Sequence, residues 1–88
     1  MKISQEKLLK IPYKQRNGIY EIENYGTIYY VNGKAHRDDG PAYKHINGYK
    51  YWCINGKYHR LDGPAREYSD YYTSWVEYYI ENKRYYTK

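Results

Sequence analysis

The sequence of 88 residues contains no phenylalanine, only one methionine and only one cysteine. The lone Cys53 excludes an intramolecular disulfide and a cysteine-based metal cluster, and it fits a reducing compartment. No apolar run approaches the ~18 residues of a membrane helix, and the first residues lack the apolar segment of a secretion signal. We therefore expect a cytoplasmic protein, in the host cytoplasm if a phage encodes it, with no membrane partner.

Tyrosine replaces the missing aromatic residue, with 16 tyrosines and 2 tryptophans in the chain. Tyrosine favours β-strands, and its apolar ring with a polar tip suits a surface that is half exposed. This composition predicts a thin all-β fold with little deep core. The same side chains are common at binding faces, so a binding role is a weaker inference from the same observation.

The net charge of +5 is concentrated at the N-terminus of the chain. Residues 1–18 hold five basic side chains and one acidic, while the remainder of the chain holds ten basic and nine acidic. We therefore predict a single domain in two parts: a basic N-terminal cap over residues 1–18 and a nearly neutral repeat domain over residues 19–88. The basic cap is the feature that would suit nucleic acid.

An internal repeat is the clearest feature of the sequence. The segment NGKAHRDDGP from Asn32 to Pro41 returns as NGKYHRLDGP from Asn55 to Pro64, a period of 23 with eight of ten positions identical. A third copy carries IENK at 80–83 where the second carries INGK at 54–57, so its period is longer by three. We place the three extra residues in the loop between Ser69 and Ser74. Repeats of this kind stack on their neighbours.

Each repeat predicts two turns. Asn-Gly between aromatic runs indicates a type I′ hairpin turn, and Asp-Gly-Pro supplies the second turn. Asn-Gly occurs at 17–18, 32–33, 47–48 and 55–56. The predicted fold is an all-β antiparallel meander of about three hairpin repeats. Its predicted strands are Ile19–Glu23, Thr27–Val31, Ala42–Ile46, Lys50–Ile54, Arg66–Ser69 and Trp75–Ile80.

The N-terminal cap permits two structures. Ser4 could cap a short helix, but Lys7 stands where a capping box takes Glu or Gln. The segment LLKIPYKQRNGIYEI equally fits a first hairpin that turns at Asn17-Gly18. We predict a strand or an irregular cap.

The pattern Y-x-NG-K-x-HR-x-DGPA resembles the MORN-like repeats of phage, bacterial and large-virus proteins. The residues that carry the resemblance are Asn32, Gly33, Lys34, His36, Arg37, Asp39–Ala42, Asn55, Gly56, Lys57, His59, Arg60 and Asp62–Ala65, within roughly residues 19–86. The resemblance implies a hairpin array used as a protein-binding or scaffold surface. A small version of it is similar to phage accessory proteins that inhibit host defence proteins, such as CRISPR complexes.

The motif His36-Arg37-x-Asp39, repeated at His59-Arg60-x-Asp62, admits a chemical interpretation as an acid–base group or a phosphate clamp. Its recurrence in register favours a structural role, because every repeat must form the same turns whereas catalysis needs one site. In that role we expect the His ring and the Arg guanidinium to bond turn carbonyls and the Asp of a neighbouring repeat.

The sequence gives little support for a metal site, a nucleophilic cysteine or a phosphate-binding loop. The three histidines are scattered and have no companion cysteine, Cys53 stands between apolar neighbours in a predicted strand, and no glycine-rich phosphate loop precedes a helix. We therefore predict a protein that is not an enzyme and that has no catalytic residue, no metal and no cofactor.

Aromatic residues occupy matching positions in the three repeats. Alternation along a strand should place Tyr29, Trp52 and Tyr78 on one face and Tyr30, Cys53 and Tyr79 on the other, one as core and one as an exposed stripe. The predicted partner-binding residues are Tyr30, Trp52, Tyr78, Tyr79, Lys14 and Arg16.

Three functions are consistent with this set. The first is binding of a protein partner, a host defence complex, which the module would occlude. The second is binding of nucleic acid or a nucleotide by the basic cap with tyrosine stacking. The third is a structural homo-oligomer, with a homodimer formed through open sheet ends.

Overall fold

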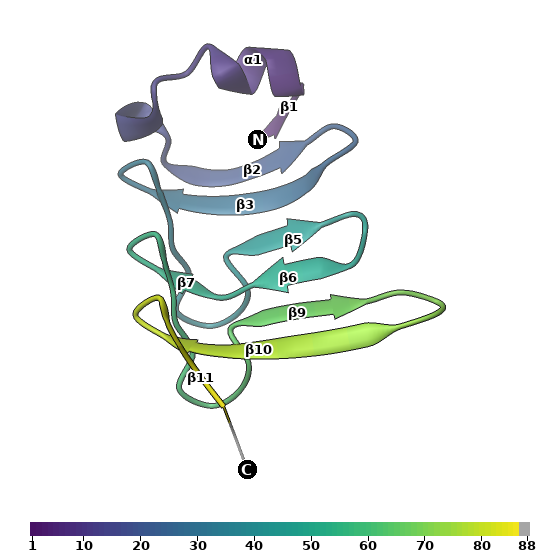
Figure 1. The fold of residues 1–88 in the computed structure, drawn as a ribbon. Coiled ribbons are helices and arrows are strands. Elements are labelled where there is room, and N and C mark those ends of the chain that lie inside the picture. The colour runs from purple at the N-terminus through teal and green to yellow at the C-terminus, as the bar shows by residue number, and fades with distance from the viewer. Residues whose placement is uncertain (87–88) are drawn as a thin grey trace.

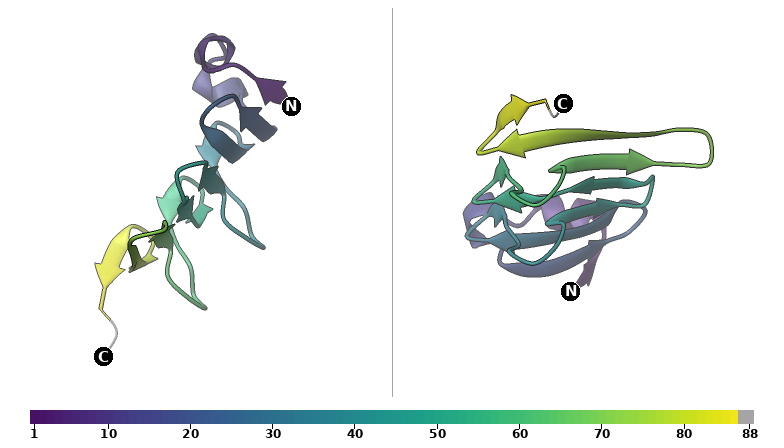
Figure 2. Two further views of the ribbon diagram at one scale, coloured as in Figure 1. Left: turned by 90° about the vertical axis from the view of Figure 1, so that its right-hand side faces the viewer. Right: turned by 90° about the horizontal axis from the view of Figure 1, so that it is seen from below.

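Antiparallel hairpins follow one another along the chain and stack side by side, each displaced from the one before it (Figures 1 and 2). The computed structural model describes residues 1–86, so the last two residues of the predicted repeat domain lie outside the described residues. The body measures 43 × 29 × 18 Å. The fold is the predicted all-β meander.

One continuous sheet runs through the molecule in the order β1-β2-β3-β5-β6-β9-β10-β11, with β4 paired to β3 and a separate β7-β8 pair. Its strands are β1 Lys2–Ile3, β2 Gly18–Ile22, β3 Gly26–Val31, β4 Lys34–Ala35, β5 Tyr43–His45, β6 Tyr49–Tyr51, β7 Cys53–Ile54, β8 Lys57–Tyr58, β9 Arg66–Ser69, β10 Ser74–Ile80 and β11 Lys83–Tyr85. All neighbouring pairs are antiparallel except β1 and β2, which are parallel.

Five of the six predicted strands correspond to single observed strands, and Arg66–Ser69 matches at both ends. The sixth, Lys50–Ile54, is wrong as one strand because the chain divides at Trp52 into β6 and β7. The Trp52 N–H still bonds the Ala65 carbonyl at 2.7 Å, but Cys53 and Ile54 leave the sheet and pair with β8. The extra three residues of the third repeat do fall within residues 69–74, where the hairpin gains the pair of Ser69 with Ser74 and has a four-residue connection in place of three.

Three turns have the type I′ form, and each has positive φ at both central residues: Asn32-Gly33, Asn55-Gly56 and Glu81-Asn82. Two of the predicted Asn-Gly turns differ. Asn47-Gly48 closes the β5–β6 hairpin through a three-residue connection in which only Gly48 has positive φ. Asn17-Gly18 is not a hairpin turn, because Gly18 starts β2 and the Asn17 side chain accepts the Asn32 N–H at 2.7 Å.

The N-terminal cap is helical in part, which corrects the prediction of a strand or an irregular segment. After β1 comes α1 (Gln5–Leu9), followed by the 3₁₀ helix η1 (Tyr13–Gln15). Ser4 caps α1 by accepting the Lys7 N–H at 3.2 Å. A helix of five residues is not stable alone in water. It forms here because Leu8 is buried against the sheet.

The main core lies under α1 at the N-terminal end of the sheet (Figure 1). Its buried members are Ile3, Leu8, Tyr20, Ile22, Ile28 and Tyr30. Further along the stack, the buried apolar residues are small: Ala42, Cys53 and Ala65. The repeat units therefore depend on contacts between neighbours rather than on one deep core. Within residues 1–86, no helix has the length and apolar character needed to cross a membrane.

Candidate functional site

Two of the predicted partner-binding residues, Arg16 and Tyr30, are buried, with 3% and 8% of their surface exposed. The Arg16 guanidinium donates to the Leu8 carbonyl at 3.0 Å, to the Ile11 carbonyl at 3.1 Å and to the Tyr30 hydroxyl at 3.3 Å. These bonds hold the end of α1 and the following loop on the sheet. The expectation that both side chains face a partner is corrected, because they anchor the cap.

The other four predicted residues are accessible but do not lie together. Lys14 is exposed on η1, at the N-terminal end of the molecule. Trp52 and Tyr78 are half-buried on one face, and the Arg60 guanidinium lies 4.0 Å from the centre of the Trp52 indole. Tyr79 is half-buried and points to the opposite face, since neighbouring side chains alternate along β10. The predicted set is therefore spread over several surfaces.

The repeated His-Arg-x-Asp motif forms the corner between units, and the predicted partners need correction. Arg37 Nε bonds the carboxylate of Asp39 in its own repeat at 3.0 Å, not that of a neighbouring repeat. Its Nη1 bonds the Pro41 carbonyl at 3.3 Å, which confirms a bond to a turn carbonyl. The His36 ring instead accepts a backbone N–H from the turn of the next unit, at Asn55.

The two corner loops project on one side of the sheet, as the left view of Figure 2 shows, and they share the same arginine contacts. In the second corner Arg60 bonds Asp62 at 3.1 Å and the Pro64 carbonyl at 3.0 Å. A side chain at Gly63 would displace the Arg60 guanidinium group, because a Cβ there would lie 2.8 Å from the guanidinium carbon. In each motif the loop thus surrounds the arginine guanidinium group, which packs on an aromatic ring (Tyr29 for Arg37, Trp52 for Arg60). This arrangement supports a structural role.

A larger accessible feature lies on the opposite side of the sheet, on strands β5, β6, β9 and β10. Here the side chains of alternate residues form a continuous layer of rings, which we call the aromatic face. Its members on these strands are Tyr43, His45, Tyr49, Tyr51, Tyr68, Trp75 and Tyr79, and the layer is extended by Tyr25 of the β2–β3 turn and Tyr58 of β8. The nine rings form one connected network.

Cross-strand register builds the aromatic face. Tyr43 lies opposite Tyr51, with ring centres 5.2 Å apart. Tyr49 lies opposite Tyr68, with ring centres 4.5 Å apart, and Tyr68 stacks on Trp75 of β10 at 5.9 Å. Such pairs stabilise a sheet by roughly 0.2–1 kcal/mol each. The rings therefore contribute to folding and to the accessible surface at the same time.

The centre of the aromatic face carries a charged pair. Arg66 Nη1 lies 3.0 Å from a carboxylate oxygen of Glu77, and the Arg66 guanidinium carbon lies 5.1 Å from the ring centres of both Tyr51 and Tyr58. The Arg66 Nε atom is buried and has no hydrogen-bond partner among the described residues. The guanidinium group thus retains one unused donor among the rings.

Two tyrosine hydroxyls of this face, those of Tyr25 and Tyr58, are kept neutral by burial. Burial raises the pKa of Tyr25 above its usual value of 10.0. Burial also raises the pKa of Tyr58, against the opposing effect of the nearby Arg66 charge. These hydroxyls can therefore both donate and accept hydrogen bonds, so the face combines apolar area with polar tips.

The part of the aromatic face beyond Tyr25 and Tyr43 is accessible because α1 covers only the N-terminal end of the sheet. Within residues 1–86, α1 lies at the β2–β3 end of the sheet and does not extend to β6, β9 and β10 (Figures 1 and 2). The rings on these three strands are half-buried, apart from the exposed Trp75. Trp75 is 36% exposed. The opposite side of the same strands carries charged residues instead, including Lys44, Lys50 and Glu67.

Sequence reasoning missed this face because it compared equal positions in successive repeats. The useful signal was the alternation within each hairpin. Tyr43 and His45 share one side of β5, and Tyr49 and Tyr51 share one side of β6. A three-residue connection between the strands then puts both pairs on the same face.

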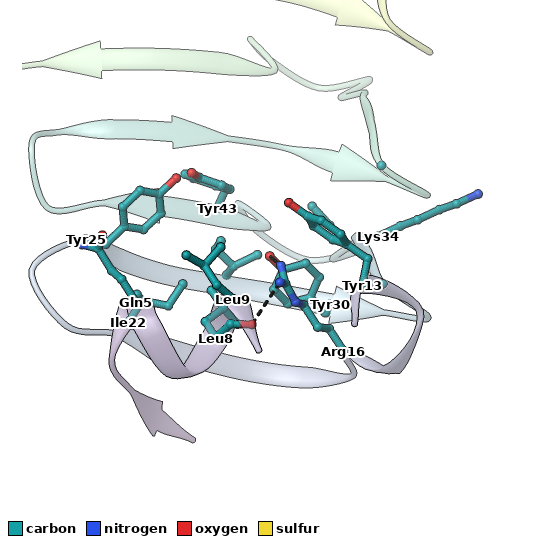
Figure 3. Close-up of a pocket in the computed structure, with 14 residues that line it drawn as sticks. Gln5, Leu8, Leu9, Tyr13, Arg16, Ile22, Tyr25, Tyr30, Lys34 and Tyr43 are labelled. Carbon is teal, nitrogen blue, oxygen red and sulfur yellow. Dashed lines mark hydrogen bonds between the residues drawn. The ribbon is translucent and has the colours of Figure 1, made fainter. Parts of the chain in front are cut away.

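A groove continues the aromatic face toward the N-terminus (Figure 3). It has a volume of about 540 Å³ and lies between α1 and the sheet, with Leu8 and Leu9 on one wall and Tyr25 and Tyr43 on the other. A second groove of about 560 Å³ lies between the two corner loops, over Trp52. Within residues 1–86 no three His, Cys, Asp or Glu side chains gather as a metal site.

No family model, curated protein or solved structure matches this chain. The resemblance to MORN-like repeats stays a prediction that rests on the repeated residues.

Proposed function

We propose that this chain is a small protein-binding module that acts by occlusion through its aromatic face. The observation that carries the proposal is the connected layer of nine rings, seven of them on β5, β6, β9 and β10. These rings are half-buried or, at Trp75, exposed, and α1 approaches them only at Tyr25 and Tyr43. Contiguous exposed aromatic surface is a common mark of interaction sites. The proposal moves the interface from the predicted residues to this face and retains Tyr79 alone from that set.

The chemistry of the face suits a protein partner. Tyrosine, tryptophan and arginine are the residues that most often dominate the binding energy of protein interfaces, and all three types are present here. The rings are held by cross-strand neighbours, so little side-chain entropy would be lost on binding. The Arg66–Glu77 pair adds a charged centre that a partner must match.

Occlusion requires only a surface whose shape matches that of the target. The MORN-like resemblance suggests the class of protein to which the target belongs. We propose a phage-type accessory protein whose target is a host defence protein. The elongated sheet would cover a functional surface of that target, and the exposed tip of the β9–β10 hairpin, with Tyr71 and Tyr72, would extend the contact.

Affinity capture from bacterial lysate tests this proposal when matched variants are used. Trp75→Ala and Tyr49→Ala alter the aromatic face, and Lys50→Ala alters the opposite face of the same strand. We expect one protein to be retained by the native chain and by Lys50→Ala, and to be lost with both face variants while their circular dichroism stays native. Capture that is equal for all variants, or no captured protein, would overturn the proposal.

The two other functions have less support. Burial of Arg16 leaves fewer basic groups available on the cap for nucleic acid. A titration with single- and double-stranded DNA and RNA at low salt measures that alternative directly, because phosphate contacts strengthen as salt falls. Mass measured in solution over a range of concentrations measures homo-oligomerisation.

A further inference from the structure

The edge of each repeat that faces the next one is normally occupied by a strand. In the first unit Thr27 of β3 pairs with Lys44 of β5. In the second unit the residue at the same place, Lys50 of β6, pairs with Glu67 of β9. The corresponding residue of the third unit is Val76 of β10, which follows Lys50 by the longer period of the third copy.

The backbone groups of Val76 point away from β9. The Ala65 carbonyl and the Ser69 N–H bond toward β6, so Arg66 and Tyr68 direct their backbone groups to β10. Their partners there are Glu77 and Trp75. Val76 lies between these two residues, and alternation along the strand therefore turns its N–H and C=O to the other edge.

Within residues 1–86 no strand pairs with Val76 at that edge, because β11 begins its pairing only opposite Tyr78. The adjacent side chains are accessible, with Trp75 36% exposed and Val76 49% exposed. An open strand edge of this kind is a template for another extended chain.

The strands that occupy the equivalent edges indicate the chemistry of an occupant. Both β5 and β9 run antiparallel to the strand that they cover. In β9 two residues face the aromatic side, Arg66 followed by Tyr68. At the β10 edge the corresponding positions would lie opposite Glu77 and then opposite Trp75.

We propose that the open edge of β10 binds an extended, antiparallel segment of another protein with the pattern Arg-x-aromatic. The arginine would lie beside the Glu77 carboxylate, where Arg84 now approaches to 3.4 Å and Arg66 to 3.0 Å. The aromatic residue would stack on Trp75, as Tyr68 already does from the other side. This edge site adjoins the aromatic face at Trp75, but it binds through the backbone of β10 and does not depend on the proposed function.

The residue pattern favours this occupant over a second copy of the chain. If β10 paired with β10 of a second molecule about Val76, Trp75 of each copy would lie opposite Glu77 of the other. That register would not reproduce the Arg-x-aromatic order of β9, and no ring would lie opposite the Trp75 indole. A segment with the β9 order places its aromatic residue there.

The β9 sequence itself provides the probe. A fluorescein-labelled peptide Gly-Pro-Ala-Arg-Glu-Tyr-Ser, identical to residues 63–69, is titrated with the full chain by fluorescence anisotropy. The matched control peptide replaces its Arg by Glu. Val76→Pro removes the N–H at the open edge without removing a bond to β9, and Val76→Thr retains that N–H.

We expect the Arg peptide to bind the native chain and Val76→Thr, and to lose about tenfold or more in affinity with Val76→Pro or with the Glu peptide, as expected for one or two lost hydrogen bonds. If Val76→Pro does not fold, hydrogen exchange of the native chain replaces it, and peptide must then slow exchange at the Val76 amide. No binding, equal binding of both peptides, or an unaffected Val76 amide overturns the proposal. Dimerisation of the chain that competes with the peptide also overturns it, in favour of a second copy.

Discussion

The Nδ1 atom of His36 accepts a hydrogen bond from the backbone N–H of Asn55, at 3.0 Å. His59 does the same for the N–H of Glu81, at 3.2 Å. In both cases the donor is the first central residue of a type I′ turn, and the histidine belongs to the preceding unit. The histidine therefore sets the distance between successive turns.

The first turn of the stack is held by Asn17 in place of a histidine, since its Oδ1 accepts the Asn32 N–H at 2.7 Å. This substitution supplies a test. We expect His59→Ala to lower the free energy of unfolding by about 1 kcal/mol, the usual net value of one hydrogen bond. His59→Asn should retain more of that stability, because Asn performs this role at position 17. Urea unfolding measures both, and equal losses for Ala and Asn would contradict the interpretation.

Gly26 should tolerate a side chain far less than Gly18 does. Both have positive φ, but a Cβ on Gly26 would lie 1.9 Å from the Lys44 carbonyl oxygen, whereas a Cβ on Gly18 would meet nothing within 4 Å. Gly18→Ala should therefore cost only the backbone strain, about 1–2 kcal/mol. Gly26→Ala must also separate β3 from β5, which should cost about 4 kcal/mol or more. Thermal and urea unfolding compare the two variants, and similar losses would show that the approach of β5 is not required.

Burial of Cys53 predicts a loss of stability in alkaline solution. Burial raises the pKa of the thiol from its usual 9.0 to about 11. Between those values the unfolded chain releases a proton that the folded chain keeps, so the free energy of unfolding falls as pH rises. The fall should reach about 2 kcal/mol by pH 11. Urea unfolding from pH 8 to 11 measures it, with Cys53→Ala as the control that removes this contribution while the tyrosines still titrate. A native thiol that reacts rapidly with a disulfide reagent at pH 8 would contradict its burial.

We expect the loop between β9 and β10 to become less stable in acid, because the Asp70 carboxylate holds it together. The Asp70 carboxylate accepts bonds from the Tyr68 hydroxyl and from the N–H groups of Tyr72 and Thr73. The hydrogen bond from Tyr68, followed by those from the backbone of Thr73 and Tyr72, lowers the pKa of Asp70 below its usual 3.8. A lowered folded-state pKa stabilises the fold above the usual value, and this contribution is lost as pH falls through the folded pKa.

NMR titration of the Asp70 carboxyl carbon measures this directly. We expect a midpoint below 3.8 in the native chain and a midpoint closer to 3.8 in Tyr68→Phe, which removes the hydroxyl but keeps the ring. An unchanged midpoint in Tyr68→Phe would show that the backbone N–H groups alone hold the carboxylate.

The meander could be predicted from the sequence because its turns are determined by residues that are adjacent in the chain. Asn32-Gly33 and Asn55-Gly56 fix type I′ turns, and such turns join adjacent antiparallel strands whatever the rest of the chain does. Asn47-Gly48 shows the limit of that signal, because the flanking strands of this hairpin set a longer connection with a different backbone conformation.

Features that depend on distant contacts could not be predicted in the same way. The helix α1 exists because Leu8 is buried against the sheet, and Arg16 is buried because carbonyls of the cap converge on it. Its charge alone indicated an exposed residue. The aromatic face needed the pairing of β6 with β9, two strands separated by a complete corner loop.

The stacked turns also define how a protein of this type can change in length. Each unit binds the next through the same backbone and side-chain bonds, so duplication of residues 32–54, one full period, would preserve every pairing on both sides of the insertion. The area of aromatic surface would then increase in whole units, because each added hairpin brings two further strands. A partner surface could thus be matched by the number of copies rather than by redesign of a single copy.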